Sequence, residues 1–215
     1  MNDILVRPSE PALAVAAALA KVTGAQVDSV PAEISGAEFA RALEGPDVAL
    51  GVMARAQGPW EIVQRSPVPL VVVPPETAAD YVLERVLVPL DGTEESAHAI
   101  GETVRLFSAA GIEISVLHVF DANTAPAHWD QAAHARSAWE NEFRARVCAP
   151  YLPSTVSTVT LRSGAPEESI LDSAARADMI VLGWSQRLLP GRARIVRHIL
   201  AEAKVPVLLT PVRHG

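Results

Sequence analysis

Residues 177–212 read ADMIVLGWSQRLLPGRARIVRHILAEAKVPVLLTPV, and this stretch decides the fold. Met179–Leu182 is a short apolar run that ends on Gly183, and Val207–Thr210 is a second apolar run. A basic loop and a helical pattern near Arg194–Ala203 separate the two runs. A buried strand, a glycine, a helix and another buried strand form a βαβ unit. Because glycine lets backbone approach a ligand and a helix start offers free N–H groups, a phosphate would bind here if the chain binds one.

The rest of the chain shows the same alternation of short apolar runs and helical patterns. The expected strands are Ile4–Val6, Val27–Val30, Asp47–Met53, Leu70–Val73, Val86–Leu90, Ile114–Phe120 and Thr155–Leu161. The expected helices are Ala12–Val22, Ser35–Leu43, a short one from Gly58–Pro59, Glu94–Ala110, Asp130–Cys148 and Glu167–Ala175. This order predicts an α/β fold, with open parallel sheets that carry helices on both faces. Ligands of such sheets bind beyond the carboxyl ends of the strands, so Asp91 and Gly183 should face one crevice if their strands are neighbours.

Two parts of the chain resemble each other. VPLVVVP at Val68–Pro74 matches VPVLLTP at Val205–Pro211, and DVALGV at Asp47–Val52 matches DMIVLG at Asp178–Gly183. Matches in the same order indicate a tandem repeat. We place the copies at residues 1–78 and 83–215, with the first lacking most simply one strand and the long helix. Both closing strands are too apolar for exposed edges, so we expect them side by side at the domain interface.

Composition narrows the class of protein. The chain has 215 residues, 49% of them hydrophobic and 20% charged, which predicts a packed globular core. Its net charge of −7 argues against nucleic-acid and membrane partners. The apolar stretch Ala12–Ala20 is too short to cross a bilayer, and a single cysteine, Cys148, excludes an intrachain disulfide. We therefore expect a cytoplasmic protein.

The second copy resembles a universal stress protein domain. The likeness rests on VLVPLDGTEES at Val86–Ser96, VLHVFD at Val116–Asp121, GAPEESIL at Gly164–Leu171, IVLG at Ile180–Gly183 and the closing VPVLLTP. The first copy is similar to a shortened form of that domain. The resemblance implies a Rossmann-like open parallel sheet and pairing of two domains through their final strands, here within one chain.

Some members of that family bind ATP, through an aspartate after the first strand and a loop G-x2-G-x9-G-[ST] after the fourth. Asp91 matches the aspartate and Gly183 the first glycine, but Gln186 stands at the second glycine. Counting back from Pro206, the closing pair falls on Ala193–Arg194. A gapped alternative places it on Gly191–Arg192, and neither pair offers a hydroxyl. The resemblance therefore implies a weakened ATP site. If a nucleotide does bind, its contacts would be Asp91, Val119, Gly183, Gln186, Arg192 and Arg194.

Charge gives a counter-argument for this loop. The segment from Gly183 onward contains six Lys and Arg residues and the single acidic residue Glu202. Arginines can hold anions without a glycine cradle. A charged run is more often a solvated face, and in that case we expect its arginines to pair with acidic residues of the other copy. Trp184 follows Gly183 and either fills the adenosine space or packs elsewhere. In the first copy Arg7 replaces the aspartate and Val52 the glycine, so no nucleotide is expected there.

The remaining candidates favour structural roles. His128 and His134 flank Asp130, but their spacing matches no compact helical metal site. His118 lies in an expected strand and should be a satisfied core or crevice residue. Cys148, near a helix end, should be a buried, inert thiol.

These observations predict a non-enzymatic stress-response protein without a resident cofactor, acting through binding or regulation. The alternatives are an ATP-binding switch with slow hydrolysis and a structural module for protein interactions. A homo-oligomer, such as a dimer, or a protein partner is expected with the lead interpretation.

Overall fold

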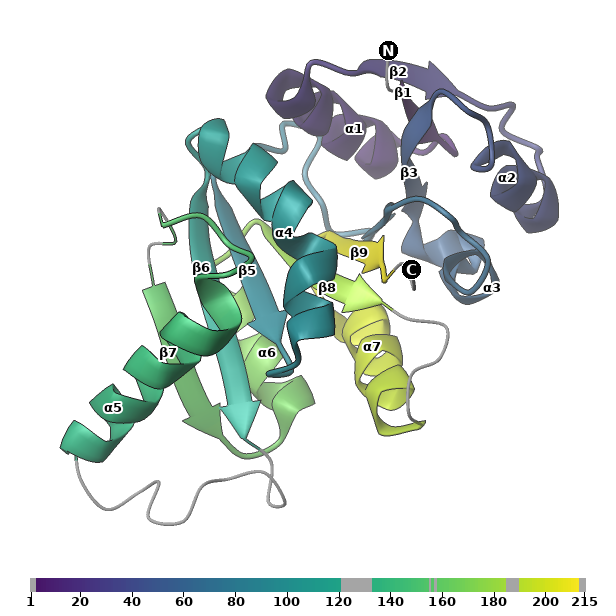
Figure 1. Ribbon diagram of the computed structural model, residues 1–215. Helices are drawn as coiled ribbons and strands as arrows, with labels where there is room; N and C mark the ends of the chain where they lie inside the picture. Colours follow the sequence, from purple (N-terminus) through teal and green to yellow (C-terminus); the bar gives the residue numbers. More distant parts are fainter. Residues whose placement is uncertain (1–2, 121–132, 155, 157, 185–189, 213–215) are drawn as a thin grey trace.

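The computed structural model describes residues 3–120, 133–154, 156, 158–184 and 190–212 of the chain. The first half contains β1 (Asp3–Val6), α1 (Glu10–Thr23), β2 (Gln26–Ser29), α2 (Gly36–Ala42), β3 (Val48–Ala54), a 3-10 turn (Arg55–Gln57), α3 (Pro59–Val63) and β4 (Leu70–Val73). The second half contains β5 (Arg85–Leu90), α4 (Glu94–Ala109), β6 (Glu113–Phe120), α5 (Ala133–Phe143), a π-helical turn (Arg144–Cys148), β7 (Thr158–Ser163), α6 (Pro166–Ala174), β8 (Met179–Trp184), α7 (Pro190–Glu202) and β9 (Val207–Pro211). Strands and helices alternate as the sequence predicts (Figure 1).

All described strands belong to one sheet of nine, in the order β2-β1-β3-β4-β9-β8-β5-β6-β7. Every neighbouring pair is parallel except β4 and β9, which run antiparallel with Leu70 opposite Leu209 and Val72 opposite Val207. The prediction that the two closing apolar strands lie side by side is confirmed. The α/β class is also confirmed, but the two predicted sheets are joined into one.

The two halves follow the same path through the sheet. The order β2-β1-β3-β4 corresponds to β6-β5-β8-β9, and β7 alone has no counterpart in the first half. One strand and one crossover helix are therefore absent from the first half, as the length difference suggests. The boundaries at 78 and 83 stay a prediction.

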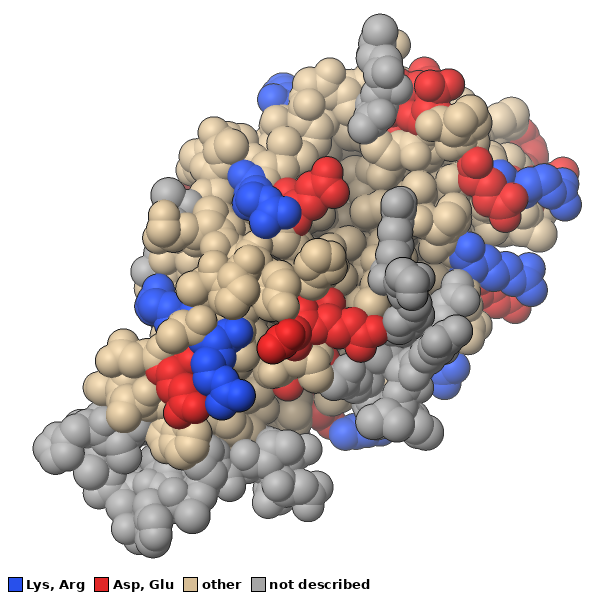
Figure 2. Space-filling view, in the orientation of Figure 1, with Lys and Arg blue, Asp and Glu red and all other residues tan. Residues whose placement is uncertain are grey.

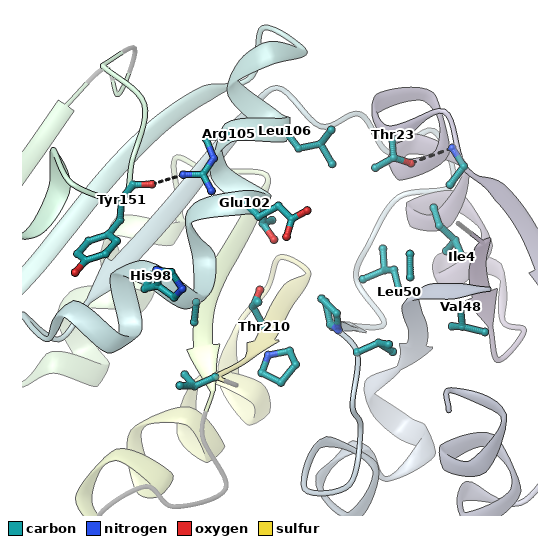
Figure 3. A pocket seen from close by; sticks show the side chains of 18 of the residues that line it. Ile4, Thr23, Val48, Leu50, His98, Glu102, Arg105, Leu106, Tyr151 and Thr210 are labelled. Carbon is teal, nitrogen blue, oxygen red and sulfur yellow. Dashed lines mark hydrogen bonds between the residues drawn. The ribbon is translucent and has the colours of Figure 1, made fainter. Parts of the chain in front are cut away.

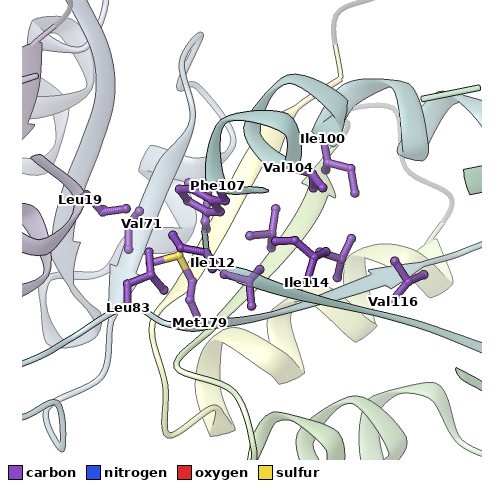
Figure 4. Close-up of a cluster of buried hydrophobic side chains, with 14 of the residues drawn as sticks. Leu19, Val71, Leu83, Ile100, Val104, Phe107, Ile112, Ile114, Val116 and Met179 are labelled. Atoms are coloured by element: carbon purple, nitrogen blue, oxygen red, sulfur yellow. The ribbon is translucent and has the colours of Figure 1, made fainter. Parts of the chain in front are cut away.

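Two apolar cores cover the two faces of the sheet. One contains side chains from α1, α4 and the turn after α5, and Phe107, Met179 and Val71 join the halves within it (Figure 4). The other packs α2, α3, α6 and α7 against the opposite face. The facing positions of β4 and β9 are at most 2% exposed. Each such Val or Leu contributes about 1.5–3 kcal/mol on burial, so the junction is part of the folded core.

Local sequence signals set the ends of several helices. Ser9 caps α1 by accepting from the N–H of Ala12, and Gly24 ends it in the left-handed conformation at φ 70°. Ser35 and Glu38 form a capping box at α2. Some expected boundaries are wrong: β7 ends at Ser163 and not at Leu161, and α7 begins at Pro190 and not near Arg194. Proline suits the first helical position, where its missing N–H has no helical partner.

Candidate functional site

The carboxyl ends of β5 and β8 lie side by side at the edge of the sheet that the sequence points to. The two strands are hydrogen-bonded neighbours, and the strand order reverses between them. Asp91 follows β5 directly, and Gly183 is the second-last residue of β8, which ends at Trp184. The sequence placed Asp91 and Gly183 together on the condition that their strands are neighbours, and the pairing of β5 with β8 meets that condition.

The Asp91 carboxylate organises the start of α4. Its Oδ1 accepts hydrogen bonds from the backbone N–H of Thr93 at 2.9 Å, from Thr93 Oγ1 at 2.6 Å and from Ser96 Oγ at 2.6 Å. Thr93 Oγ1 in turn accepts from the N–H of Ser96 and caps the helix. Asp91 is exposed, but this oxygen already has three donors, so its main visible role is to hold the turn between β5 and α4.

Gly183 brings β8 against the first turn of α4. A Cβ added at this position would lie 3.3 Å from the carbonyl oxygen of Ser96 and 3.5 Å from its Cα. Glycine at this position therefore allows β8 and α4 to pack closely. The same Ser96 contacts Asp91, so the two residues that match the family's ATP motif meet on one helix turn.

His118 and Val119 lie on β6, on opposite faces of the sheet. His118 is buried, its Nδ1 is 2.7 Å from the carbonyl oxygen of Leu90, and its ring stacks on Phe143 at 4.7 Å. Burial lowers the pKa of His118, against the opposing effects of the Leu90 carbonyl and Asp91. The expectation of a satisfied buried histidine is confirmed. Val119 packs against the core on the α6 and α7 face.

The arginines of α7 are engaged within the protein. Arg194 forms an ion pair with Glu167 of α6 at 2.5 Å. The pKa of Glu167 is lowered by its hydrogen bond to backbone, by Arg194 and by His198. Arg194 thus pairs within the second half, whereas the sequence suggested acidic residues of the other copy. Arg192 lies in the first turns of α7 and its side chain is outside the described residues, as is all of Gln186.

Trp184 lies on the opposite face of β8 from Gly183. It is 5% exposed and packs edge-on against Trp60 of α3, with ring centroids 5.1 Å apart. The guanidinium of Arg197 lies 4.2 Å from the centre of the Trp60 ring. Of the two alternatives for Trp184, packing elsewhere is the one that agrees with this position. Side chains alternate across a strand, so Gly183 faces α4 whereas Trp184 faces the core that contains α3 and α7.

In the first half, Arg7 follows β1, as Asp91 follows β5. Its two terminal nitrogens donate to the carbonyl oxygens of Gln57 at 3.1 Å and Ile34 at 2.8 Å. Val52 is fully buried in the neighbouring strand. An arginine tied to two backbone segments closes this end of the first half. The expectation that no nucleotide binds there stays a prediction.

A groove at the junction of the two halves was not foreseen. It has a volume of about 1310 Å³ and lies between the outer face of α4 and the starts of β1 and β3 (Figure 3). Val68 and Pro69, just before β4, and the end of β9 form its floor. We call it the junction groove. Sequence reasoning missed it because its walls come from segments far apart in the chain, and only the charged outer face of α4 gave a signal.

Other candidate chemistry is limited in the part of the chain that the structure describes. No group of three metal-ligating side chains occurs there, and Asp130 and His128 lie outside that part. Nothing is described of the His134 side chain. Cys148 is buried, as expected, and burial raises its pKa to about 11, which disfavours a reactive thiolate. Among the described helices, none is long and apolar enough to cross a membrane.

Comparisons with known proteins agree with this geometry. No curated protein matches the sequence. A universal stress protein from Archaeoglobus fulgidus is similar in structure at 17% identity, with 91% of this chain and 77% of that chain covered and a TM-score of 0.59. A functionally unknown protein from Pseudomonas aeruginosa is similar at 15% identity, with 97% and 81% covered and a TM-score of 0.57. Another Archaeoglobus fulgidus universal stress protein, solved in complex with dAMP, gives 14% identity, 60% and 98% coverage and a TM-score of 0.39.

The two similarities with TM-scores of 0.59 and 0.57 show the shared fold. The sequence profile of the Universal stress protein family matches residues 83–211, which is more than half of the chain and covers every element from β5 to β9. The chain therefore belongs to the universal stress protein family.

Proposed function

We propose that this protein acts in the stress response by non-enzymatic binding or regulation and does not hold ATP in the manner of the ATP-binding family members. The observation that carries the proposal is the state of Asp91. Its Oδ1 accepts from three donors of Thr93 and Ser96, and it supports the cap of α4. A ligand that used this oxygen would have to replace hydrogen bonds that already hold a helix start.

The segment after β8 supports the same proposal. Counted forward from Gly183, the spacing of the ATP motif places its closing Gly-[Ser/Thr] pair on Val196 and Arg197. Both lie inside α7, where Val196 is 6% exposed and Arg197 contacts Trp60. β8 ends at Trp184 and α7 begins at Pro190, so five positions, 185–189, separate them. The last two positions of the motif therefore lie within a helix, where their backbone N–H groups are not free to bind a phosphate as they would be in a loop or at a helix start.

The described arginines offer little support for a substitute anion site. Arg194 is paired with Glu167, and Arg197 covers Trp60. The side chains that the charge argument relied on are thus used to attach α7 to α6 and to α3. Residue types suited to covalent chemistry are also poorly placed, since Cys148 is buried with a raised pKa.

An ATP-binding switch is the second candidate. The observation in its favour is that Asp91 is exposed at the strand-order reversal, where ligands of open α/β sheets bind. A related universal stress protein has been solved with dAMP, which makes nucleotide binding the natural alternative to test.

A thermal unfolding titration of the full chain with MgATP separates the two candidates. A ligand present at one hundred times its Kd stabilises the native state by about 2.7 kcal/mol. For a chain of this size that raises Tm by roughly 5–10 °C. We expect no such rise at millimolar MgATP.

Asp91→Asn and Asp91→Ala are the matched variants, because asparagine keeps an acceptor for Thr93 and Ser96 whereas alanine removes it. The proposal predicts that Asp91→Ala lowers Tm more than Asp91→Asn, with or without MgATP. A clear rise of Tm with MgATP in the wild type that both variants lose would establish the switch and overturn the proposal.

A further inference from the structure

The junction groove has one charged wall, provided by α4. Glu94, Glu95 and Glu102 lie on the exposed side of this helix and line the groove together with His98 and Arg105 (Figure 3). Figure 2 shows acidic side chains over α4, beside the hollow in this face. Arg105 donates to the carbonyl oxygen of Tyr151 at 2.9 Å and is the one cation among these five side chains. The wall is therefore predominantly negative.

Glu102 occupies the middle of that wall. It is exposed and forms no ion pair within the described residues. Glu94 accepts a hydrogen bond from the hydroxyl of Tyr151 at 3.1 Å. A cationic occupant would thus meet Glu102 without first breaking an internal ion pair.

The opposite wall and the floor are mostly apolar. The wall consists of Ile4, Val48, Ala49 and Leu50 at the starts of β1 and β3, and the floor contains Val68, Pro69, Pro211 and Val212. Leu106 stands at the rim, and 42% of it is exposed. It is the continuous apolar lining beside a charged wall, and not the single leucine, that is typical of a surface that contacts a partner.

Thr210 gives an independent sign that the floor lacks something. It is 7% exposed, and its Oγ1 has no hydrogen-bond partner in the described part of the chain. It points toward α4 from the floor of the groove (Figure 3). A buried hydroxyl without a partner is destabilising, and a polar group seated on the floor would relieve this.

We propose that the junction groove binds a basic, amphipathic segment of a partner protein, with its cations on α4 and its apolar side chains on the starts of β1 and β3. The volume of about 1310 Å³ exceeds that of ordinary small-molecule pockets and suits a peptide segment. A second copy of this chain fits less well, because it carries the same net charge of −7. This inference names the partner of the binding role proposed above and rests on that role.

Fluorescence anisotropy with the full chain tests the proposal directly. The probe is a labelled peptide of alternating lysine and leucine, and the comparison peptides alternate lysine with serine and glutamate with leucine. We expect the lysine–leucine peptide to bind most tightly, with an affinity that falls as salt rises. Equal affinity for the lysine–serine peptide would overturn the proposal, since the apolar wall would then contribute nothing.

Variants locate the binding site. Glu102→Lys should weaken the peptide about tenfold or more, because it places a like charge in the middle of the wall. Glu202→Lys makes the same charge change at the exposed last residue of α7, a helix that packs on the opposite face of the sheet, and should change affinity less than twofold. Equal losses in the two variants would show attraction by net charge alone and would overturn the site.

Thr210→Val and the oligomeric state complete the test. Thr210→Val should lower the affinity for the peptide without lowering the Tm of the free protein, because the free protein loses only an unpaired hydroxyl. Sedimentation that shows a wild-type dimer broken by Glu102→Lys would make the groove a self-interface and overturn the partner assignment. Peptide binding and the MgATP titration are separate measurements, so failure of the groove is distinguishable from failure of the non-nucleotide role.

Discussion

A single carboxylate, Asp91, holds the turn between β5 and α4 through Thr93 and Ser96. Gly183 contributes to the same place from β8, because its missing Cβ leaves room for Ser96. Both residues match positions of the family's ATP motif. Their described contacts nevertheless account for them as parts of a strand–helix packing. A motif match therefore identifies the family more securely than the ligand.

His118 links this turn to the core and makes stability depend on pH. Its ordinary pKa is 6.5, and burial lowers the folded-state pKa below that. Below pH 6.5 the unfolded chain then binds more protons than the folded one, so the free energy of unfolding falls as pH falls. The contribution is complete above 6.5 and is lost as pH drops through the folded-state pKa.

His118→Phe should flatten this part of the pH profile, since phenylalanine can still pack on Phe143 and Phe120. Urea unfolding at a series of pH values measures the slope. Glu167→Gln is the comparison, because the pKa of Glu167 is lowered from 4.5 and its contribution is lost only at more acidic pH. An unchanged slope just below pH 6.5 in His118→Phe would show that another group causes it.

Helix α4 has a different structural role at its start, on its apolar side and on its outer side. Its start is capped by Thr93, its apolar side enters the core, and its outer side lines the junction groove. Gly101 adds a fourth contact, since a Cβ there would lie 2.8 Å from the carbonyl oxygen of Tyr151. This carbonyl accepts from Arg105, so the segment after the π-helical turn is attached directly to α4.

Gly101→Ala should destabilise the protein by about 1–3 kcal/mol. Alanine favours a helix interior by about 1 kcal/mol over glycine, but backbone would have to move to admit the Cβ. Chemical unfolding measures the net effect.

Gly36→Ala is the matched control, at the first position of α2, where the nearest atom to an added Cβ is Ile62 Cδ1 at 3.6 Å. That variant should be neutral or slightly stabilising. A neutral Gly101→Ala would show that the contact with Tyr151 is easily relieved.

The described part of the molecule is built on one continuous open sheet, whose two halves are joined at its centre by the antiparallel pair β4 and β9. Trp60, Trp184 and Arg197 reinforce this junction on one face, and Val71, Phe107 and Met179 on the other. The first half thus covers an edge and two apolar surfaces of the second half. Strands with such surfaces associate when they are exposed.

Residues 79–215 produced alone should therefore self-associate through β9. Light scattering coupled to gel filtration would show a dimer or larger species, whereas the full chain serves as the reference. Leu208→Lys in the shortened chain should reduce association, because it puts a charge beside the unpaired edge. A monomeric, well-folded fragment would contradict the role given to the first half.

Much of the fold could be predicted from local patterns. The apolar runs located β4, β8 and β9, and Ser35 and Thr93 marked helix starts through their own hydrogen bonds. Even the β4–β9 contact followed from composition, because such apolar strands need cover. These features depend on neighbouring residues or on burial alone, so the order of residues suffices for them.

The candidate site depended on contacts that no local pattern specifies. Alternation along β8 shows that Gly183 and Trp184 face opposite ways, but only packing places Ser96 beside one and Trp60 beside the other. The junction groove likewise combines α4 with the starts of β1 and β3. The family, the alternation of strands and helices and the pairing of the two closing strands follow from the sequence. The donors to Asp91, the partner of Arg194 and the groove were decided by tertiary structure, because distant segments meet only after the sheet has formed.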